Sequence, residues 1–406
     1  MQDVRGSVLS LFTGAGGLDL GLEAAGFDTV ACLELDKTCR DTLRKNRKTW
    51  TQLPTNDVTV AAKELKPEHL DLEVGELDVI AGGPPCQPFS MAAQWANTGR
   101  RGMEDDRAKT VIAMLDLVES FLPKALFIEN VAGFLRGEIS AAPFITERLT
   151  EINKKHGTAY RLDPRVVDAS HYGVPQRRNR VIAVAVKDGL PFKWPDPEYR
   201  DKPMTAWDAI GHLRQTKLPA NQGTWTELLA SIPEGGNYLH LTARGEGEEL
   251  FGYRTRYWSF LLKLAKDQPA WTLPASPGPS TGPFHWNNRP LTALECLLLQ
   301  TFPRDWKLEG KHRQQIKQAG NATPPLLAEV VGRALYTHLH GEPYDTGELV
   351  YLPKKSDRTP PKPVPPKPIP ARFREMVGDK DAHPGEGMGP SPREKALNKD
   401  EALSLF

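Results

Sequence analysis

Residues 9–27 read LSLFTGAGGLDLGLEAAGF, and this stretch decides the fold because a short apolar strand runs into a glycine-rich turn and then a helix. Gly14, Gly16 and Gly17 let the backbone approach a ligand closely, and the free amides that open the helix favour its polar groups. About 18 residues beyond Gly16, Glu34 ends the next expected strand, where a carboxylate can accept both ribose hydroxyls. The turn departs from the G-x-G-x-x-G pattern, which disfavours a pyrophosphate ligand. A plain tight turn is the alternative interpretation.

Short β-branched apolar runs then alternate with helix-length amphipathic segments, a rhythm typical of a parallel sheet with crossover helices. It predicts an α/β fold with a doubly wound, mostly parallel sheet. The expected strands are residues 7–12, 29–35, 77–81, 125–129, 165–168 and 180–186. The expected helices are residues 18–25, 36–48, 107–121 and 143–155.

The rhythm breaks after Lys187 and returns near residue 287, which predicts four regions. We expect residues 1–188 to form a first domain and residues 189–286, rich in Pro, Gly and Trp, to form a small separate domain. Residues 287–345 return to the first domain with helices at 292–301 and 324–338. Residues 346–406 hold much of the proline surplus and are expected to be a tail in polyproline II conformation or disorder.

The composition narrows the class of protein. The 406 residues include 52 Lys and Arg against 51 Asp and Glu, which gives a net charge of +1. This charge does not indicate a nucleic-acid or membrane partner, so any such partner would have to bind a local basic patch. The 4 cysteines form no CxxC or Cys/His pairing, which predicts no metal site and a reducing compartment. No signal-like start and no long apolar run occur, so we expect a cytoplasmic protein without a membrane partner.

Three further motifs stand at the ends of expected strands. Cys86 stands in GGPPCQPFS just past a strand, where a rigid loop presents a thiol instead of burying it as an inert hydrophobe. Such a thiol needs nearby positive charge or amides to lower its pKa, ordinarily about 8.5. Glu129 ends the strand KALFIENV, and Arg177, Arg178 and Arg180 stand in QRRNR. A solvated strand end and a solvated basic turn are the alternatives to binding an anion or a base edge.

Together these motifs resemble the DNA cytosine-5 methyltransferase family of bacterial type. FTGAGG, GGPPCQPFS, ENV, QRRNR, RPLTALECLLLQTFPRDW and QAGNATPP occur in the family order and cover about residues 7–338 apart from the variable middle segment. The resemblance implies an S-adenosylmethionine site lined by Phe12, Gly14, Gly16, Glu34, Asp57 and Asn321. It also implies that Cys86 is the nucleophile toward carbon 6 of a flipped cytosine. Glu129 would donate to ring nitrogen 3, and Arg178 and Arg180 would orient the base and the loop.

The same resemblance implies that residues 90–107 close over the base and that residues 189–286 are a target recognition domain for a short sequence in double-stranded DNA. Arg254, Arg256 and Lys263 interleave with aromatics in FGYRTRYWSFLLK, which suits phosphate contacts but equally suits a core flanked by cations. The stretch AAQWANTGRR and Thr323 depart from the family form. We expect a nucleoid-associated monomer with a cognate restriction endonuclease that acts separately. The residues leave open a relative acting on transfer RNA, a silent DNA-binding relative and, from another class, a nicotinamide oxidoreductase.

Overall fold

The computed structural model describes residues 5–85, 109–135, 140–251, 256–345 and 347–375. Among these residues, six strands form one sheet in the order β2-β1-β3-β4-β7-β5. Pairing is parallel from β2 to β4 and antiparallel where β7 joins β4 and β5. The predicted mostly parallel, doubly wound sheet is therefore confirmed. The strands are β1 (Gly6–Leu11), β2 (Phe27–Leu33), β3 (Val79–Gly82), β4 (Ala125–Asn130), β5 (Arg161–Asp168) and β7 (Asn179–Val186).

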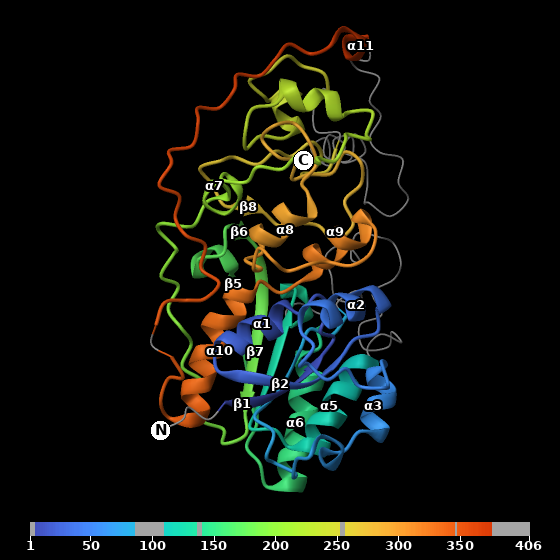
Figure 1. Ribbon diagram of the computed structural model, residues 1–406, viewed down its shortest axis with the longest axis vertical. Helices are drawn as coiled ribbons and strands as arrows, with labels where there is room; N and C mark the ends of the chain where they lie inside the picture. The colour runs from blue at the N-terminus through green and yellow to red at the C-terminus, as the bar shows by residue number, and fades with distance from the viewer. Residues whose placement is uncertain (1–4, 86–108, 136–139, 252–255, 346, 376–406) are drawn as a thin grey trace, which may run out of the picture.

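Helices cover both faces of this sheet (Figure 1). The core of one face joins the sheet to α3 (Val58–Glu64), α5 (Lys109–Phe121) and α6 (Ala142–His156). On the other face lie α1 (Gly17–Ala24) and α10 (Pro325–His340). Most residues of the central strands β1, β3 and β4 are apolar, because both faces of these strands are buried.

Two glycines of α1 explain how closely α10 approaches it. A Cβ atom on Gly17 would lie 2.1 Å from the carbonyl oxygen of Thr323, and one on Gly21 would lie 2.3 Å from that of Pro325. The spacing of four residues puts both glycines on one side of α1. The end of the chain's catalytic part is thereby held directly beside the glycine turn.

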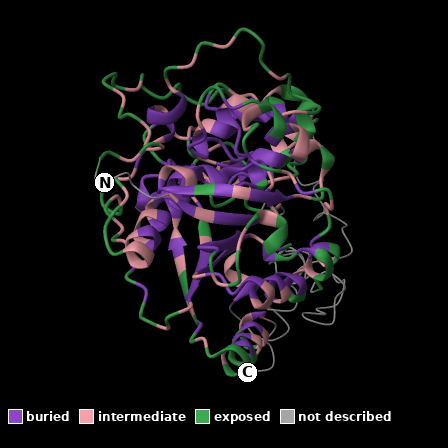
Figure 2. Ribbon diagram, turned by 60° about the horizontal axis from the view of Figure 1, so that its bottom comes forward, coloured by how far each residue is buried: buried purple, intermediate pink, exposed green. Residues whose placement is uncertain are grey.

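The inserted segment, residues 189–286, contains little regular structure. It holds α7 (Ala206–Ile210), η6 (Thr226–Ser231), η7 (Tyr238–Leu241) and β8 (Ala270–Trp271). β8 pairs in parallel with β6 (Gln176–Arg177), which belongs to the catalytic part. The remaining elements are α2 (Lys37–Asn46), η1 (Pro67–Leu70), η4 (Ala132–Phe134), η5 (Ala169–Tyr172), α8 (Ala293–Leu299), α9 (His312–Asn321) and α11 (Ala371–Arg374). Figure 2 shows that buried residues concentrate in the sheet and continue into the inserted segment.

The first part of the expected Pro-rich tail is extended over most of its length and packs on the rest of the protein. Residues 347–375 do not hang free of the protein: they lie along its flank, and Ile369 and Phe373 are buried among residues of the inserted segment. Proline-rich composition opposes regular structure, but it does not prevent an extended chain from burying two apolar side chains. The rest of the expected tail, residues 376–406, lies outside the described residues. Within the described part, no helix is long and apolar enough to cross a membrane.

Candidate active site

The glycine turn between β1 and α1 is built from residues with left-handed backbone angles. Phe12 has φ 56°, Gly14 has φ 58° and Gly16 has φ 84°. A Cβ atom on Gly16 would lie 2.9 Å from Trp50 and 3.0 Å from Leu43, so packing as well as backbone angle requires glycine there. At Gly14 a Cβ atom would meet only the carbonyl oxygen of Phe12, at 3.8 Å. The turn is therefore packed against Trp50 and Leu43 at Gly16, whereas there is space beside Gly14.

Glu34 is joined to this turn by a hydrogen bond. Its Oε2 accepts from the amide of Gly14 at 2.7 Å, and its Oε1 accepts from the amide of Asp36 at 2.7 Å. Burial raises the pKa of Glu34, and the two amides oppose that shift. Each carboxylate oxygen can accept a second hydrogen bond. A diol could therefore bind at Glu34 without breaking the link to the turn.

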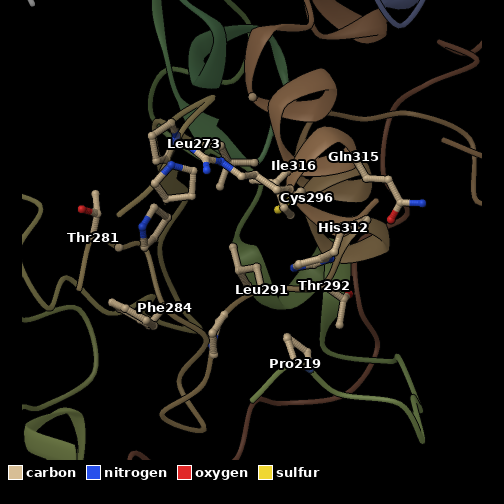
Figure 3. A pocket seen from close by; sticks show the side chains of 18 of the residues that line it. Pro219, Leu273, Thr281, Phe284, Leu291, Thr292, Cys296, His312, Gln315 and Ile316 are labelled. Atoms are coloured by element: carbon tan, nitrogen blue, oxygen red, sulfur yellow. The ribbon is translucent and has the colours of Figure 1, made fainter. Parts of the chain in front are cut away.

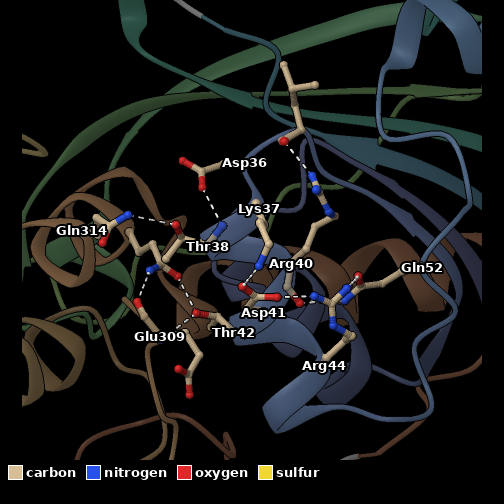
Figure 4. Close-up of polar contacts among 12 residues, drawn as sticks. Asp36, Lys37, Thr38, Arg40, Asp41, Thr42, Arg44, Gln52, Glu309 and Gln314 are labelled. Atoms are coloured by element: carbon tan, nitrogen blue, oxygen red, sulfur yellow. Dashed lines mark hydrogen bonds and ion pairs between the residues drawn. The ribbon is translucent and has the colours of Figure 1, made fainter. Parts of the chain in front are cut away.

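α2 begins at Lys37, three residues after Glu34, and is held to α9 by polar contacts (Figure 4). Asp36 caps α2 through the amide of Thr38 at 2.8 Å, and Gln314 donates to the Thr38 hydroxyl at 3.1 Å. Thr42 donates to Gln318 at 2.7 Å. These contacts hold α2 against the helix that ends at Asn321.

Two other residues predicted for the cofactor are less firmly placed. Asp57 is exposed and caps α3, where it accepts from the amide and the hydroxyl of Thr59, both at 2.8 Å. Asn321 is exposed at the end of α9. Among the described residues, no hydrogen bond joins either side chain to Glu34 or Gly14. Their contacts with a cofactor remain predictions.

The strand end that carries Glu129 lies against the segment leading to Cys86. Glu129 is buried at 6% exposure, and its Oε1 is 3.1 Å from Nε of Arg180 in an ion pair. A Cβ atom on Gly83 would lie 3.4 Å from Oε2 of Glu129, and Asn130 donates through Nδ2 to the carbonyl oxygen of Pro84 at 2.8 Å. GGPP, ENV and QRRNR therefore meet in space, although Cys86 and residues 90–107 lie outside the described residues.

Arg178 occupies a different position from Arg180. It is 1% exposed, and its Nη2 donates to the carbonyl oxygens of Gly320 and Ala322, each at 3.0 Å. These carbonyls flank Asn321. The described contacts of Arg178 thus position the end of α9, and its predicted contact with the base stays a prediction.

Gln176 and Gln300 form a buried polar junction that sequence reasoning missed. Gln176 donates to Gln300 at 3.1 Å and accepts from the amide of Leu273 in the inserted segment at 3.2 Å. Gln300 donates to the carbonyl oxygen of Ala319 at 2.7 Å. Both glutamines stand in motifs that the sequence singled out, but a motif does not show which of its members bind one another. Asn130 was missed for the same reason.

The inserted segment is attached at this junction. The Arg177 guanidinium lies 4.9 Å from the centre of the Trp271 ring, and Thr272 donates to the carbonyl oxygen of Arg177 at 2.7 Å. A cavity of about 920 Å³ lies next to it, between α8, α9 and residues 217–222 and 273–284 (Figure 3). Among the described residues predicted for catalysis or the cofactor, none lines this cavity. It belongs to the junction with the inserted segment.

The other cysteines are unsuited to nucleophilic chemistry. Cys32, Cys39 and Cys296 are free and buried, and burial raises the pKa of each thiol, to about 12 for Cys32. A thiol with a raised pKa carries almost no thiolate at neutral pH. No group of His, Cys, Asp or Glu in the described part of the chain could hold a metal ion.

Asp19 is a buried carboxylate in the first turn of α1, directly after the glycine turn. Its titration provides a test of the packing around this turn. Desolvation raises its pKa from 3.8 to about 7, opposed by the nearby Ser10 hydroxyl. Between about pH 4 and 7 the folded protein holds a proton that the unfolded chain releases, so the free energy of unfolding falls as pH rises. We expect Asp19→Asn to remove much of that fall, measured by urea denaturation at pH 5 and pH 8. If wild type and Asp19→Asn lose equal unfolding free energy between these pH values, Asp19 does not cause the fall. Asp116→Asn, which changes a partly exposed carboxylate, is the control.

Comparison with known proteins agrees with this geometry. Residues 6–337 match the family described as C-5 cytosine-specific DNA methylase. The Type II methyltransferase M.SacI of Streptomyces achromogenes is 34% identical over 369 residues, covering 82% of this chain and 93% of that protein. The Type II methyltransferase M.PspPI of a Psychrobacter species is 34% identical over 362 residues, covering 84% of this chain and 82% of that protein.

Solved structures agree on the fold. A crystal structure described as a putative DNA modification methyltransferase from an Escherichia coli prophage superposes with a TM-score of 0.59 at 23% identity, covering 82% of this chain and 99% of that chain. The S. pombe Dnmt2 methyltransferase gives a TM-score of 0.54 at 15% identity, with coverage of 82% and 98%. The family match spans most of the chain, and the described motifs of that family meet at one edge of the sheet. This chain therefore belongs to the C-5 cytosine-specific DNA methylases.

Proposed function

We propose that this DNA cytosine-5 methyltransferase acts through a covalent adduct between Cys86 and carbon 6 of a cytosine flipped out of a short, specific sequence in double-stranded DNA. The observation that carries the proposal is the meeting of Gly83 and Pro84, which lead to Cys86, with the Glu129–Arg180 pair. A base inside a duplex cannot present carbon 6 to a thiol, so the base must leave the stack.

The order of bond changes follows from the chemistry of cytosine. Carbon 5 is a poor nucleophile, and addition of the Cys86 thiolate to carbon 6 converts the ring into an enamine. Carbon 5 of that enamine can take the methyl group from the sulfonium of S-adenosylmethionine, and the broken sulfur–methyl bond leaves a neutral thioether, S-adenosylhomocysteine. The displaced electron pair is stabilised when Glu129 protonates or hydrogen-bonds ring nitrogen 3. A base then removes the hydrogen from carbon 5, and the Cys86 thiolate leaves as the double bond between carbons 5 and 6 re-forms. A proton held on ring nitrogen 3 returns to Glu129 in the same step.

The ion pair with Arg180 gives Glu129 a fixed orientation. Because Oε1 is paired with Arg180, Oε2 faces Gly83 and the segment that leads to Cys86. This arrangement supports a donor at Oε2 and an Arg180 side chain close enough to the same base to contact its ring carbonyl. The buried setting strengthens both interactions.

We further propose that S-adenosylmethionine, which supplies the methyl group, binds at the glycine turn. The residues present fit it: Gly14 leaves space, Glu34 offers acceptors for the ribose hydroxyls, and Phe12 stands between strand and turn. Two carboxylates, Glu34 and Asp57, favour a cationic adenosyl ligand over a phosphate-bearing one.

Glu34→Gln tests this site. We expect the affinity for S-adenosylmethionine to fall by about 10- to 100-fold, because hydrogen bonds to a charged group contribute about 1.5–3 kcal/mol. Isothermal titration calorimetry measures it. The control is Glu23→Gln, which removes a carboxylate of α1 that pairs with Arg47 instead. Unchanged affinity in Glu34→Gln would exclude Glu34 as the ribose acceptor.

Transfer of a labelled methyl group tests the proposed reaction. The protein, labelled S-adenosylmethionine and genomic DNA should yield 5-methylcytosine in DNA, and transfer RNA under the same conditions should stay unlabelled. If only transfer RNA is labelled, the substrate is transfer RNA and not DNA. If neither nucleic acid is labelled, the proposed methyltransferase activity is wrong.

We also propose that the chain acts in the cytoplasm as a monomer, beside a separate restriction endonuclease for the same sequence. The two relatives named above as Type II methyltransferases support this pairing. DNA methylated by the chain should then resist one Type II endonuclease and remain sensitive to others.

A further inference from the structure

The C-terminal strap, residues 347–375, connects the catalytic layers to the far end of the inserted segment. In Figure 1 it leaves α10 near the bottom of the molecule and ascends along one side to α11 at the top. Its lower end is fixed by Glu329 of α10, whose carboxylate accepts from the amides of Val350 at 2.8 Å and Tyr351 at 3.0 Å. The first contact of the strap is thus with the helix that packs beside α1.

The middle of the strap is bound to α7. Asp208 accepts from the amide of Ser356 at 2.9 Å, and the indole of Trp207 donates to the carbonyl oxygen of Arg358 at 2.8 Å. α7 also packs in the apolar cluster that contains Ala15 of the glycine turn. This second contact therefore lies between the two parts that the strap connects.

The upper end completes the core of the inserted segment. Ile369 and Phe373 are 3% and 1% exposed, and every other buried member of their apolar cluster comes from residues 228–284. The Phe373 ring stacks on Trp225 with centroids 5.6 Å apart at 30°. The amide of Lys367 donates to the carbonyl oxygen of Ala230 at 2.8 Å.

Ion pairs surround this apolar contact. Arg372 pairs with Glu227 at 2.7 Å, and Arg374 pairs with Glu248 at 2.8 Å. Exposed pairs of this kind contribute little energy, but they fix the register of α11 on the inserted segment. The proline-rich run before them is stiff and loses little conformational entropy on ordering. The strap is therefore suited to hold two parts at a set separation.

We propose that the strap, through Ile369 and Phe373, positions the inserted segment for DNA recognition. The inference rests on the proposed function and on the expectation, implied by the family resemblance, that residues 189–286 read the target sequence. The inserted segment has little regular structure of its own, so its arrangement depends on side-chain packing, and two of the packed side chains arrive from the strap. Weaker packing of Ile369 and Phe373 would move the inserted segment relative to Glu129 and Arg180, while the glycine turn would stay in place.

Steady-state kinetics of Phe373→Ala, with DNA and S-adenosylmethionine varied separately, tests the proposal. We expect the KM for DNA to rise about tenfold or more, because small displacements far from the reacting atoms have effects of that size. The Kd for S-adenosylmethionine and kcat at saturating DNA should stay within about twofold of wild type. Phe373→Leu, which keeps an apolar side chain, should show a smaller rise.

Val364→Ala is the matched control, because Val364 is an apolar residue of the same strap that is 71% exposed. It should leave the KM for DNA unchanged. An unchanged KM in both Phe373 variants would overturn the proposal. A parallel loss of kcat and cofactor affinity in Phe373→Leu would overturn it as well, since that pattern signals general destabilisation.

Hydrogen exchange separates this inference from the proposed function. Amides of residues 225–241 should exchange faster in Phe373→Ala than in wild type, whereas amides of β1 and β4 should not change. If wild type transfers no methyl group to DNA, the proposed function fails whatever the exchange shows. If wild type methylates DNA and residues 225–241 exchange equally in both proteins, the strap inference alone fails.

Discussion

Cys86→Ser should abolish methyl transfer to DNA, lowering kcat by at least about a thousandfold, which corresponds to about 4 kcal/mol of lost transition-state stabilisation. A serine hydroxyl is a far weaker nucleophile than a thiolate, so the addition to carbon 6 would fail. Cofactor affinity should be unchanged, because the glycine turn and Glu34 are built from other elements. Methyl transfer under single-turnover conditions and calorimetry with S-adenosylmethionine measure the two effects.

Trapping gives the same prediction a covalent readout. DNA containing 5-fluorocytosine lacks the hydrogen that must leave carbon 5, so the enzyme should remain bonded to carbon 6 as a stable adduct. Wild type should form that adduct and Cys86→Ser should not. Cys296→Ser removes a buried thiol with a raised pKa and serves as the control. Adduct formation by Cys86→Ser would show that another group attacks the base.

Glu129→Gln is expected to reduce kcat by about 10²- to 10⁴-fold, the range for loss of a general acid. Glutamine keeps the shape of the side chain, but it supplies no acidic proton to ring nitrogen 3 and no charge to orient Arg180. The KM for DNA should change much less, because DNA contacts far from the base are unaffected. Comparison of kcat and KM for wild type and variant measures this split.

Glu119→Gln is the matched control for that variant. Glu119 is also a carboxylate in ion pairs, with Arg148 and Lys155, but it lies on α5 outside the meeting point of the motifs. Its removal should leave kcat unchanged. Equal losses of kcat in the two variants would mean that Glu129 acts on stability and not on the reaction.

The sheet could be predicted from the sequence because its strands are short apolar runs bounded by turn residues. The short helix α3 could not, since seven residues with only Val58 and Ala61 buried give no clear helical period. α9 was missed for a related reason: its buried face consists of Gln318, Ala319 and Gly320, and no apolar stripe marks it. Polar helices of this kind are defined by tertiary hydrogen bonds.

The site could be predicted as a set of motifs but not as a set of contacts. Glu34 accepts a hydrogen bond from the amide of Gly14, and Glu129 pairs with Arg180, but the sequence predicted neither contact. Gln176 and Gln300, far apart in the sequence, bind each other in the fold, and no spacing rule indicates such a pair. The strap was missed because composition alone does not show that Phe373 buries its ring in a distant core.

The most direct test of the central claim is bisulfite sequencing of DNA from a methylation-free bacterial host that expresses the protein. We predict that cytosines resist conversion at one position of a single short sequence throughout the genome, and that expression of Cys86→Ser leaves every such cytosine convertible. Complete conversion in cells that contain folded, cofactor-binding wild-type protein would contradict the claim that this chain methylates carbon 5 of cytosine in DNA.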